Sequence, residues 1–198
     1  MLSSFRKHSA PKFDLHLDEY PRTPTEFHRF ENMQVTQILG NLYLGNADEA
    51  NPSSWITQYD CVFTIMDEHY RSYYTTLYEI YQKTHPQFIH QFISLQDHSD
   101  ANLSIAMLFG IAGIINRYIV DKKKVLVHCQ QGFSRSPTII IAYLMIYGIQ
   151  DERTFSEMHT SYHDAFNHIK CRRTRISPNL GFCLRLRELE NRLTISRM

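Results

Sequence analysis

The chain has 198 residues, 43% of them hydrophobic, and a formal net charge of +1 at pH 7. This length favours a single domain with enough apolar residues for a core. A net charge near zero argues against a strongly electrostatic partner such as nucleic acid. The four cysteines, Cys61, Cys129, Cys171 and Cys183, have no paired spacing. Together with the lack of a signal-peptide or lipidation pattern, they predict a reducing compartment, the cytoplasm or nucleus, and no membrane association.

Hydrophobic periodicity predicts alternating strands and helices along most of the chain. Residues 1–28 are polar and contain three prolines, which predicts a flexible or extended arm before a domain at 29–192 and a short tail at 193–198. The predicted strands are Gln37–Leu44 with a turn at Gly40–Asn41, Cys61–Met66, Ile89–Leu95 and Val125–Val127, the last of them central. The predicted helices are Tyr70–Tyr81, Leu103–Val120, Thr138–Tyr147, Thr154–Lys170 and Asn179–Leu193.

This order of elements predicts an α/β fold, with a central, mostly parallel sheet of about five strands flanked by helices on both faces. The segment Leu103–Val120 is apolar but contains Asn116 and Arg117, so we expect a buried core helix rather than a membrane span. The segment His69–Tyr81 carries five tyrosines that line up with Leu77 along one helix face. Core packing is the expected role of that stripe, with a docking surface or phosphorylation site as the alternative.

Two polar clusters have competing interpretations. His159 and His163 have the spacing of metal ligands on a helix, but no Cys or carboxylate completes a site nearby, so a surface or capping role is favoured. Arg172, Arg173 and Arg175 form a basic cluster, for which a solvated face is the usual role. Recruitment of a phosphorylated substrate is the alternative for these arginines.

The most informative segment reads V-L-V-H-C-Q-Q-G-F-S-R-S-P, from Val125 to Pro137. A strand leads into a short glycine-containing loop and then into a helix, an arrangement that gathers backbone N–H donors and binds an oxyanion. The same field favours the thiolate of Cys129. Arg135 can hold two phosphate oxygens in a planar fork. These residues indicate phosphoryl transfer to Cys129, and a buried structural cysteine at a strand end is the alternative.

The segment His128–Ser136 resembles the signature loop of cysteine-based protein phosphatases, and its ending Gly-x-Ser-Arg-Ser is similar to the dual-specificity branch. The resemblance implies that Cys129 is the nucleophile and that Ser136 hydrogen-bonds its sulfur. It also implies that the loop after Cys129 binds phosphate and that His128 and Asn179 orient this loop. The residues of that loop are Gln130, Gln131, Gly132, Phe133, Ser134 and Arg135.

A general acid is needed to protonate the leaving oxygen of a phosphate ester. Ile93–Asp97 resembles the family's general-acid loop, and Asp97 precedes Cys129 by a family-like interval. Asp100 is the competing carboxylate, and helix capping before Leu103 is the alternative role for either aspartate.

The resemblance extends from about Glu31 to Glu190 and includes the turn Pro178-Asn179-Leu180-Gly181-Phe182. The C-terminal part resembles the serine/threonine/tyrosine-interacting branch, whose pseudophosphatase members lack the nucleophile that this chain has. The connection between Gly148 and Tyr162 is longer than the family pattern, so family rules for that region do not transfer.

The resemblance implies a metal-free and cofactor-free phosphatase acting on phosphotyrosine and on phosphoserine or phosphothreonine. Phosphorylated proteins are the expected partners, without nucleic acid or membrane, and the sequence does not indicate an oligomeric state. A phosphopeptide-binding or scaffold module with weak catalysis is one alternative. A phosphatase for RNA 5′ ends or phosphoinositides is another, which the neutral Gln130, Gln131 and Phe133 and the near-neutral chain disfavour.

Overall fold

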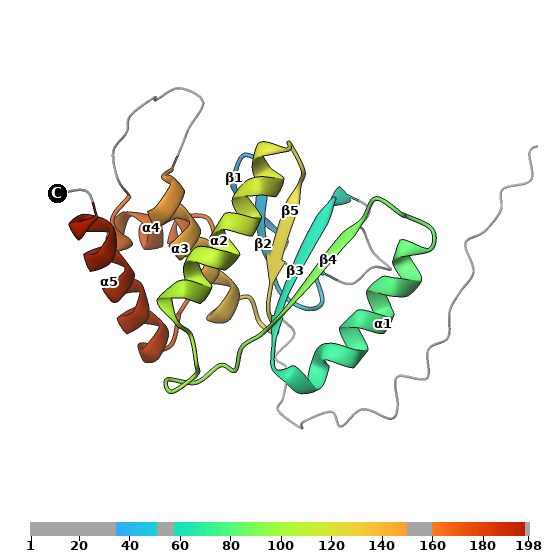
Figure 1. Cartoon of the computed structure of the whole chain (residues 1–198), viewed down its shortest axis with the longest axis horizontal. Coiled ribbons are helices and arrows are strands. Elements are labelled where there is room, and N and C mark those ends of the chain that lie inside the picture. Colours follow the sequence, from blue (N-terminus) through green and yellow to red (C-terminus); the bar gives the residue numbers. More distant parts are fainter. Residues whose placement is uncertain (1–34, 51–57, 150–159, 197–198) are drawn as a thin grey trace, which may run out of the picture. The chain divides into compact units, whose positions relative to one another are not determined.

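The computed structural model describes residues 35–50, 58–149 and 160–196, all of which belong to the compact unit Met33–Met198. Its centre is one five-stranded sheet with the order β1-β2-β5-β3-β4 (Figure 1). The β1–β2 pair is antiparallel and the other neighbours are parallel. The strands are β1 (Thr36–Leu39), β2 (Leu42–Gly45), β3 (Cys61–Met66), β4 (Ile89–Ser94) and β5 (Val125–His128). The sequence prediction of a mostly parallel sheet with Val125–Val127 at its centre is confirmed.

The two strands at the centre of the parallel region are buried along their whole length. All six residues of β3 and all four of β5 are buried, as expected for a parallel sheet covered on both faces. Alternation along β3 divides its side chains between two apolar clusters. Cys61, Phe63 and Ile65 join the larger cluster, and Val62 and Met66 join the smaller one.

Helices cover both faces of the sheet (Figure 1). The short 3-10 helix η3 (Glu68–Tyr70) leads into α1 (Arg71–Gln82), which packs on the face of the smaller cluster. The other helices lie on the opposite face, where α3 packs against the sheet and against the other three. They are α2 (Ile105–Val120), α3 (Arg135–Tyr147), α4 (Tyr162–Lys170) and α5 (Leu180–Ile195).

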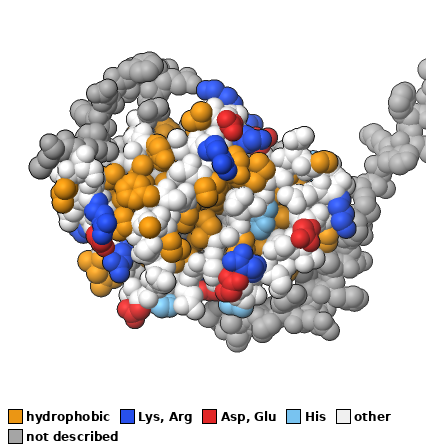
Figure 2. All heavy atoms as spheres, in the orientation of Figure 1, with side chains coloured by type: hydrophobic (Ala, Val, Ile, Leu, Met, Phe, Trp, Pro, Cys, Tyr) orange, Lys and Arg blue, Asp and Glu red, His pale blue; other side chains and the backbone are white. Residues whose placement is uncertain are grey.

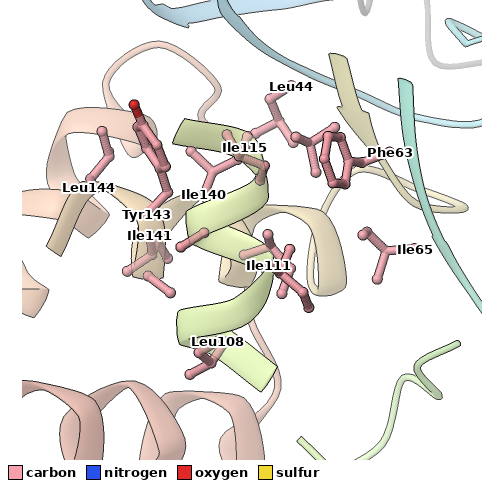
Figure 3. Packing of buried hydrophobic residues seen from close by; sticks show 14 of the residues in the cluster. Leu44, Phe63, Ile65, Leu108, Ile111, Ile115, Ile140, Ile141, Tyr143 and Leu144 are labelled. Carbon is pink, nitrogen blue, oxygen red and sulfur yellow. The ribbon is translucent and has the colours of Figure 1, made fainter. Parts of the chain in front are cut away.

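The larger cluster is built around α2 and α3. Figure 3 shows Ile111 and Ile115 of α2 and Ile140 of α3 beside Leu44, Phe63 and Ile65 of the strands. Every residue of α3 from Arg135 to Met145 is buried, because helices enclose it on the side away from the sheet. The Tyr143 hydroxyl donates to Asn116 Oδ1 at 3.4 Å, which gives the polar side chain of α2 a partner. The prediction of a buried core helix for Leu103–Val120 is confirmed.

The tyrosine stripe of α1 packs against the other face. Tyr74 and Tyr78 are buried, and the Tyr78 ring stacks on Phe88 with ring centroids 5.5 Å apart. Tyr70, Tyr73, Tyr81 and Leu77 are partly buried against the same cluster. The prediction of core packing for this stripe is confirmed.

The predicted helix Thr154–Lys170 is wrong at Thr160 and Ser161, which are not helical. Helix α4 begins at Tyr162 because the Ser161 side chain accepts the amide N–H of Asp164 and caps it. Residues 150–159, with His159 and most of the longer connection, lie outside the described residues, as does the predicted arm 1–28.

The described surface has no large block of one charge sign on the face drawn in Figure 2. Lys and Arg side chains lie singly or beside Asp and Glu, with apolar side chains between them. Exposed apolar residues of α2 and α5 include Phe109, Val120, Leu180 and Leu184. None of the helices in the described ranges is both long enough and apolar enough to cross a membrane.

Candidate active site

Three parallel strands end at one edge of the sheet, and each supplies a residue of the candidate site. Asp67 follows β3, Asp97 follows β4, and Cys129 follows β5. The carboxyl ends of parallel strands meet at one edge, which is where open α/β sheets bind ligands. Cys129 is 1% exposed, so its position is set by the strand behind it and the loop around it.

Neighbouring segments brace the loop that follows Cys129. The Gln130 carbonyl accepts the Ala47 amide at 3.2 Å, and the Phe133 carbonyl accepts the Ser177 amide at 2.7 Å. A trans peptide unit is planar and holds its C=O and the following N–H in opposite directions. The N–H groups of Gln131 and Ser134 are therefore directed away from these braces, and an oxyanion held by the loop can accept them.

Gly132 is required by both conformation and space. Its φ is 67°, in the left-handed region that favours glycine. A Cβ at this position would lie 2.6 Å from Nη2 of Arg173 and 2.8 Å from the Gly45 carbonyl oxygen. The loop therefore packs directly on the Arg173 guanidinium and on the end of β2.

The first turn of α3 supplies a hydrogen bond to the candidate nucleophile. Ser136 is fully buried, and its hydroxyl donates to Sγ of Cys129 at 3.1 Å. The same helix begins at Arg135, so its positive end faces the loop. The structure thus brings Cys129 and Ser136 together, as the sequence predicted.

The Arg135 side chain is held on two sides. Its Nη1 donates to Oδ2 of Asp67 at 3.3 Å and to the Leu95 carbonyl at 3.4 Å. Its Nε lies 3.5 Å from Oδ2 of Asp97. The Arg135 side chain is 7% exposed, so these contacts fix the plane of its guanidinium before any ligand arrives.

The Asp97 carboxylate is oriented by two elements that are distant in sequence. Its Oδ1 accepts the Ser134 hydroxyl at 2.6 Å and the Asn179 amide at 3.0 Å. Ser134 Oγ also accepts the Asn179 backbone N–H at 3.2 Å. Asn179 in turn caps α5 by accepting the Phe182 amide, so the start of that helix locates the Asp97 loop.

Asp100, the competing carboxylate, lies away from Arg135 in this arrangement. It is exposed, its amide N–H contacts Nδ1 of His98, and Ser99 is the partner of its Oδ1. The alternative role of capping the following helix is not what the structure shows for Asp97 or Asp100. Ser104 caps α2 by accepting the Met107 amide at 3.1 Å, since Ser104 directly precedes the first helical residue.

His128 is buried beneath the loop and bonded to a neighbouring strand. Its Nε2 lies 2.8 Å from Oγ1 of Thr64. Burial lowers the pKa of His128 to about 3, so the ring is neutral near pH 7. This placement fits an orienting role rather than proton transfer during the reaction.

The basic cluster near the C-terminus does not form one exposed surface. Arg173 is 5% exposed, and its Nη2 lies 3.3 Å from Oε2 of Glu49. Burial raises the pKa of Glu49, and Arg173 opposes that rise. Arg172 donates to the His168 carbonyl at the end of α4. The interpretation of Arg173 as a substrate-recruiting residue is therefore wrong, because it lies beneath Gly132 rather than at the surface.

Three further groups belong to this arrangement and were not predicted from the sequence: Asp67, Glu49 and the Leu95 carbonyl. One available signal was that Asp67 directly follows a strand that pairs with the Cys129 strand. The Glu49–Arg173 pair joins residues 124 positions apart, and no local pattern announces it. Among the described residues, no group of His, Cys, Asp and Glu side chains is placed to hold a metal ion, and His163 bonds Asn167.

Comparison with known proteins places this geometry in a family. Residues 42–192 match the family model described as dual specificity phosphatase, catalytic domain. Human dual specificity protein phosphatase 9 is 32% identical over 160 residues, which cover 80% of this chain and 37% of that protein. Dual specificity protein phosphatase 1 of Arabidopsis thaliana is 29% identical over 157 residues, covering 78% of this chain and 68% of that one. The chain thus spans little more than a third of the human relative.

Solved structures share the fold. Human tyrosine phosphatase-like serine/threonine/tyrosine-interacting protein has a TM-score of 0.64 at 24% identity, covering 81% of this chain and 98% of that chain. Human DUSP28 has a TM-score of 0.63 at 20% identity, covering 81% and 95% respectively. At these identities the likeness concerns the fold, while the family model extends over most of the sequence. The chain therefore belongs to the dual specificity phosphatase family.

Proposed function

We propose that this protein is a cysteine-dependent protein phosphatase that hydrolyses phosphotyrosine and also phosphoserine or phosphothreonine. The observation that carries the proposal is the arrangement around Cys129. Its Sγ accepts the Ser136 hydroxyl at 3.1 Å, and the buried Arg135 stands beside Asp97 at 3.5 Å. A nucleophile, an oxyanion-binding loop and an acid thus lie within one edge of the sheet.

In the first step, Cys129 Sγ attacks phosphorus and the bond to the leaving oxygen breaks. Charge on the equatorial oxygens is stabilised by the loop N–H groups and by the fork of Arg135. Asp67 and the Leu95 carbonyl hold that fork in place through Nη1. Positioning of this kind supplies most of the catalysis in phosphoryl transfer.

Asp97 protonates the leaving oxygen. Its Oδ1 already accepts two hydrogen bonds, so Oδ2 delivers the proton once a bound phosphate has replaced it beside Arg135 Nε. The side chain is 32% exposed, which lets it reach a bound ester. In the second step Asp97 takes a proton from water, which attacks the phosphocysteine, and the Ser136 hydroxyl stabilises the departing sulfur.

The loop residues support a protein substrate. Gln130 and Phe133 are half-buried and Gln131 is exposed, so the side chains that the loop itself presents between Cys129 and Ser134 are neutral. An inositol phospholipid carries additional phosphates that neutral side chains do not bind well. We expect phosphotyrosine peptides to react faster than phosphothreonine peptides, because the longer side chain reaches Cys129 and phenoxide is the better leaving group. Phosphorylated proteins of the cytoplasm or nucleus are the proposed substrates.

Two other functions remain as alternatives to test. A phosphopeptide-binding or scaffold module would use the same cradle without turnover. A phosphatase for RNA 5′ ends or phosphoinositides would use the same chemistry on another substrate.

The test is a set of initial rates on one phosphotyrosine peptide, one phosphothreonine peptide, a phosphoinositide and a 5′-triphosphorylated RNA. The Cys129→Ser variant is the control for contaminating activity. The proposal predicts hydrolysis of both peptides, with a higher rate on the phosphotyrosine peptide than on the phosphothreonine peptide, and low rates on the lipid and the RNA. Faster turnover of either non-peptide substrate would contradict the protein-phosphatase proposal, and binding of peptides without turnover would favour the scaffold.

A further inference from the structure

A chain of hydrogen-bonded side chains runs across three strands behind the signature loop. Thr64 Oγ1 lies 2.8 Å from Nε2 of His128 and 3.0 Å from Nε2 of His90. Thr64 on β3 is paired directly with His128 on β5, and His90 lies on β4, the other neighbour of β3. All three side chains thus project from the sheet face that α1 covers.

Aromatic rings pack against this chain and enclose its Thr64–His128 end. Thr64 and His128 are fully buried, the Tyr74 ring lies 5.7 Å from the His128 ring, and the Tyr78 ring lies 4.1 Å from the His90 ring. The Tyr78 hydroxyl also interacts with Thr64, but it donates its proton to the Ala50 carbonyl at 3.1 Å. A lost hydrogen bond inside this enclosure cannot readily be replaced by water.

Both histidines are neutral in these surroundings. Burial lowers the pKa of His90 to about 4 and that of His128 to about 3. A neutral imidazole has one N–H donor and one acceptor nitrogen, and a threonine hydroxyl has a single proton. At least one ring must therefore donate its Nε2–H to Thr64, because the single hydroxyl proton can serve only one of them.

Thr64 is the hydrogen-bond partner that holds the His128 ring. Its Oγ1 meets Nε2 at 2.8 Å, whereas Nδ1 is buried and its contact with the Cys129 backbone falls short of full hydrogen-bond geometry. His90 holds the Thr64 hydroxyl from the other side.

We propose that Thr64 and His90 are positioning residues for the reaction at Cys129. They fix the ring orientation of His128, and His128 is the residue that joins β5 to the nucleophile. Neither side chain reaches the substrate, so their effect is on the placement of Sγ and of the loop start. The inference rests on the proposed function for its kinetic readout and has a second readout that is independent of turnover.

The test compares Thr64→Val, which has a similar shape without the hydroxyl, with Thr64→Ser, which keeps the hydroxyl. Hydrolysis of p-nitrophenyl phosphate should show kcat lowered at least about tenfold in Thr64→Val with KM nearly unchanged. Thr64→Ser should recover most of the wild-type rate. His90→Phe, which removes the hydrogen-bonding nitrogen at a half-buried position, should resemble Thr64→Val.

The second readout is the rate at which iodoacetate alkylates Cys129, followed by peptide mass spectrometry. Exposed Cys171 in the same molecule is the internal reference. Thr64→Val and His90→Phe should slow alkylation of Cys129 several-fold relative to Cys171, while Thr64→Ser should not. If both substitutions leave kcat and relative alkylation within about twofold of wild type, the proposal is wrong. If the wild type shows no turnover but the alkylation pattern holds, the proposed function fails and the positioning role stands.

Discussion

Replacing Gly181 with alanine should misplace Asp97 without touching it. Gly181 lies in the first turn of α5, and an added Cβ would be 1.9 Å from the Ser99 carbonyl oxygen and 2.7 Å from its carbon. Reaching even the closest separation that real Cβ atoms show, 3.0 Å, requires a shift of about 1.1 Å (3.0 minus 1.9). Both sides of the contact are backbone, so either the loop of Asp97 or the start of α5 must move.

Such a displacement acts on the acid because Asn179, two residues before Gly181, donates to Oδ1 of Asp97. A misplacement of about 1 Å in catalytic geometry costs on the order of 100-fold in rate. We expect Gly181→Ala to lower kcat/KM about 100-fold on a phosphoserine peptide, whose alkoxide leaving group needs a proton. On p-nitrophenyl phosphate the loss should be under about tenfold, because that leaving group departs with little assistance.

The matched control is Gly110→Ala in α2, where an added Cβ meets nothing within 4 Å. It should leave both rates unchanged, and urea unfolding should show that both variants are folded at the assay temperature. Wild-type activity of Gly181→Ala on the phosphoserine peptide would refute this reasoning. Equal losses on the two substrates would also refute it, since the effect would then not involve proton donation.

Arg135→Lys should lose most activity although the charge is kept, because an ammonium group cannot bind two phosphate oxygens while also contacting Asp67 and the Leu95 carbonyl. A wild-type kcat in this variant would contradict the prediction. Asp97→Asn should slow phosphoserine peptides far more than p-nitrophenyl phosphate, and Asp100→Asn should not; the reverse pattern would make Asp100 the acid. In the folded protein the pKa values of His90 (about 4) and His128 (about 3) lie below the ordinary histidine value of 6.5. Below pH 6.5 the unfolded chain therefore binds more protons than the folded protein, and the stability of the fold decreases as the pH falls. From pH 7 to pH 5 the two histidines together should reduce the free energy of unfolding by about 4 kcal/mol, measured by urea titration. His90→Gln should remove about half of that loss and exposed His163→Gln none; an unchanged loss in His90→Gln would show that His90 is not buried neutral.

The sequence was sufficient where one local pattern decides the structure. Strand β3 matches its predicted bounds because the run Cys61–Met66 is apolar throughout, apart from Thr64, and is buried on both faces. The start of α4 was not predictable to the residue, because Thr160 and Ser161 fit a helical pattern as well as a cap. The choice of Ser161 as the cap follows from its contact with Asp164, which a periodicity argument does not weigh.

The candidate site divides in the same way. Cys129, Arg135 and Ser136 lie in one contiguous motif, so their proximity follows from the sequence. Asp97 could be chosen over Asp100 only by spacing and resemblance, while the structure adds its contacts with Ser134 and Asn179.

The partners that brace the site depend on strand register and chain crossing, which no local pattern encodes. Asp67 reaches Arg135 because β3 and β5 are paired, and Thr64 reaches His128 for the same reason. Arg173 illustrates the opposite error. A basic run usually lies in solvent, but here the chain turns after α4 and places this arginine against Glu49 under the loop.

The central claim is that Cys129 carries the phosphoryl group during turnover. The most direct measurement uses the Ser136→Ala variant, which lacks the hydroxyl that lies 3.1 Å from Sγ and should therefore release the sulfur slowly. The variant is mixed with p-nitrophenyl phosphate, quenched in acid within the first turnover and digested for mass spectrometry. We expect a phosphoryl group on the peptide that contains Cys129, and no turnover in Cys129→Ser. A phosphoryl group on another residue, or sustained hydrolysis by Cys129→Ser, would contradict it.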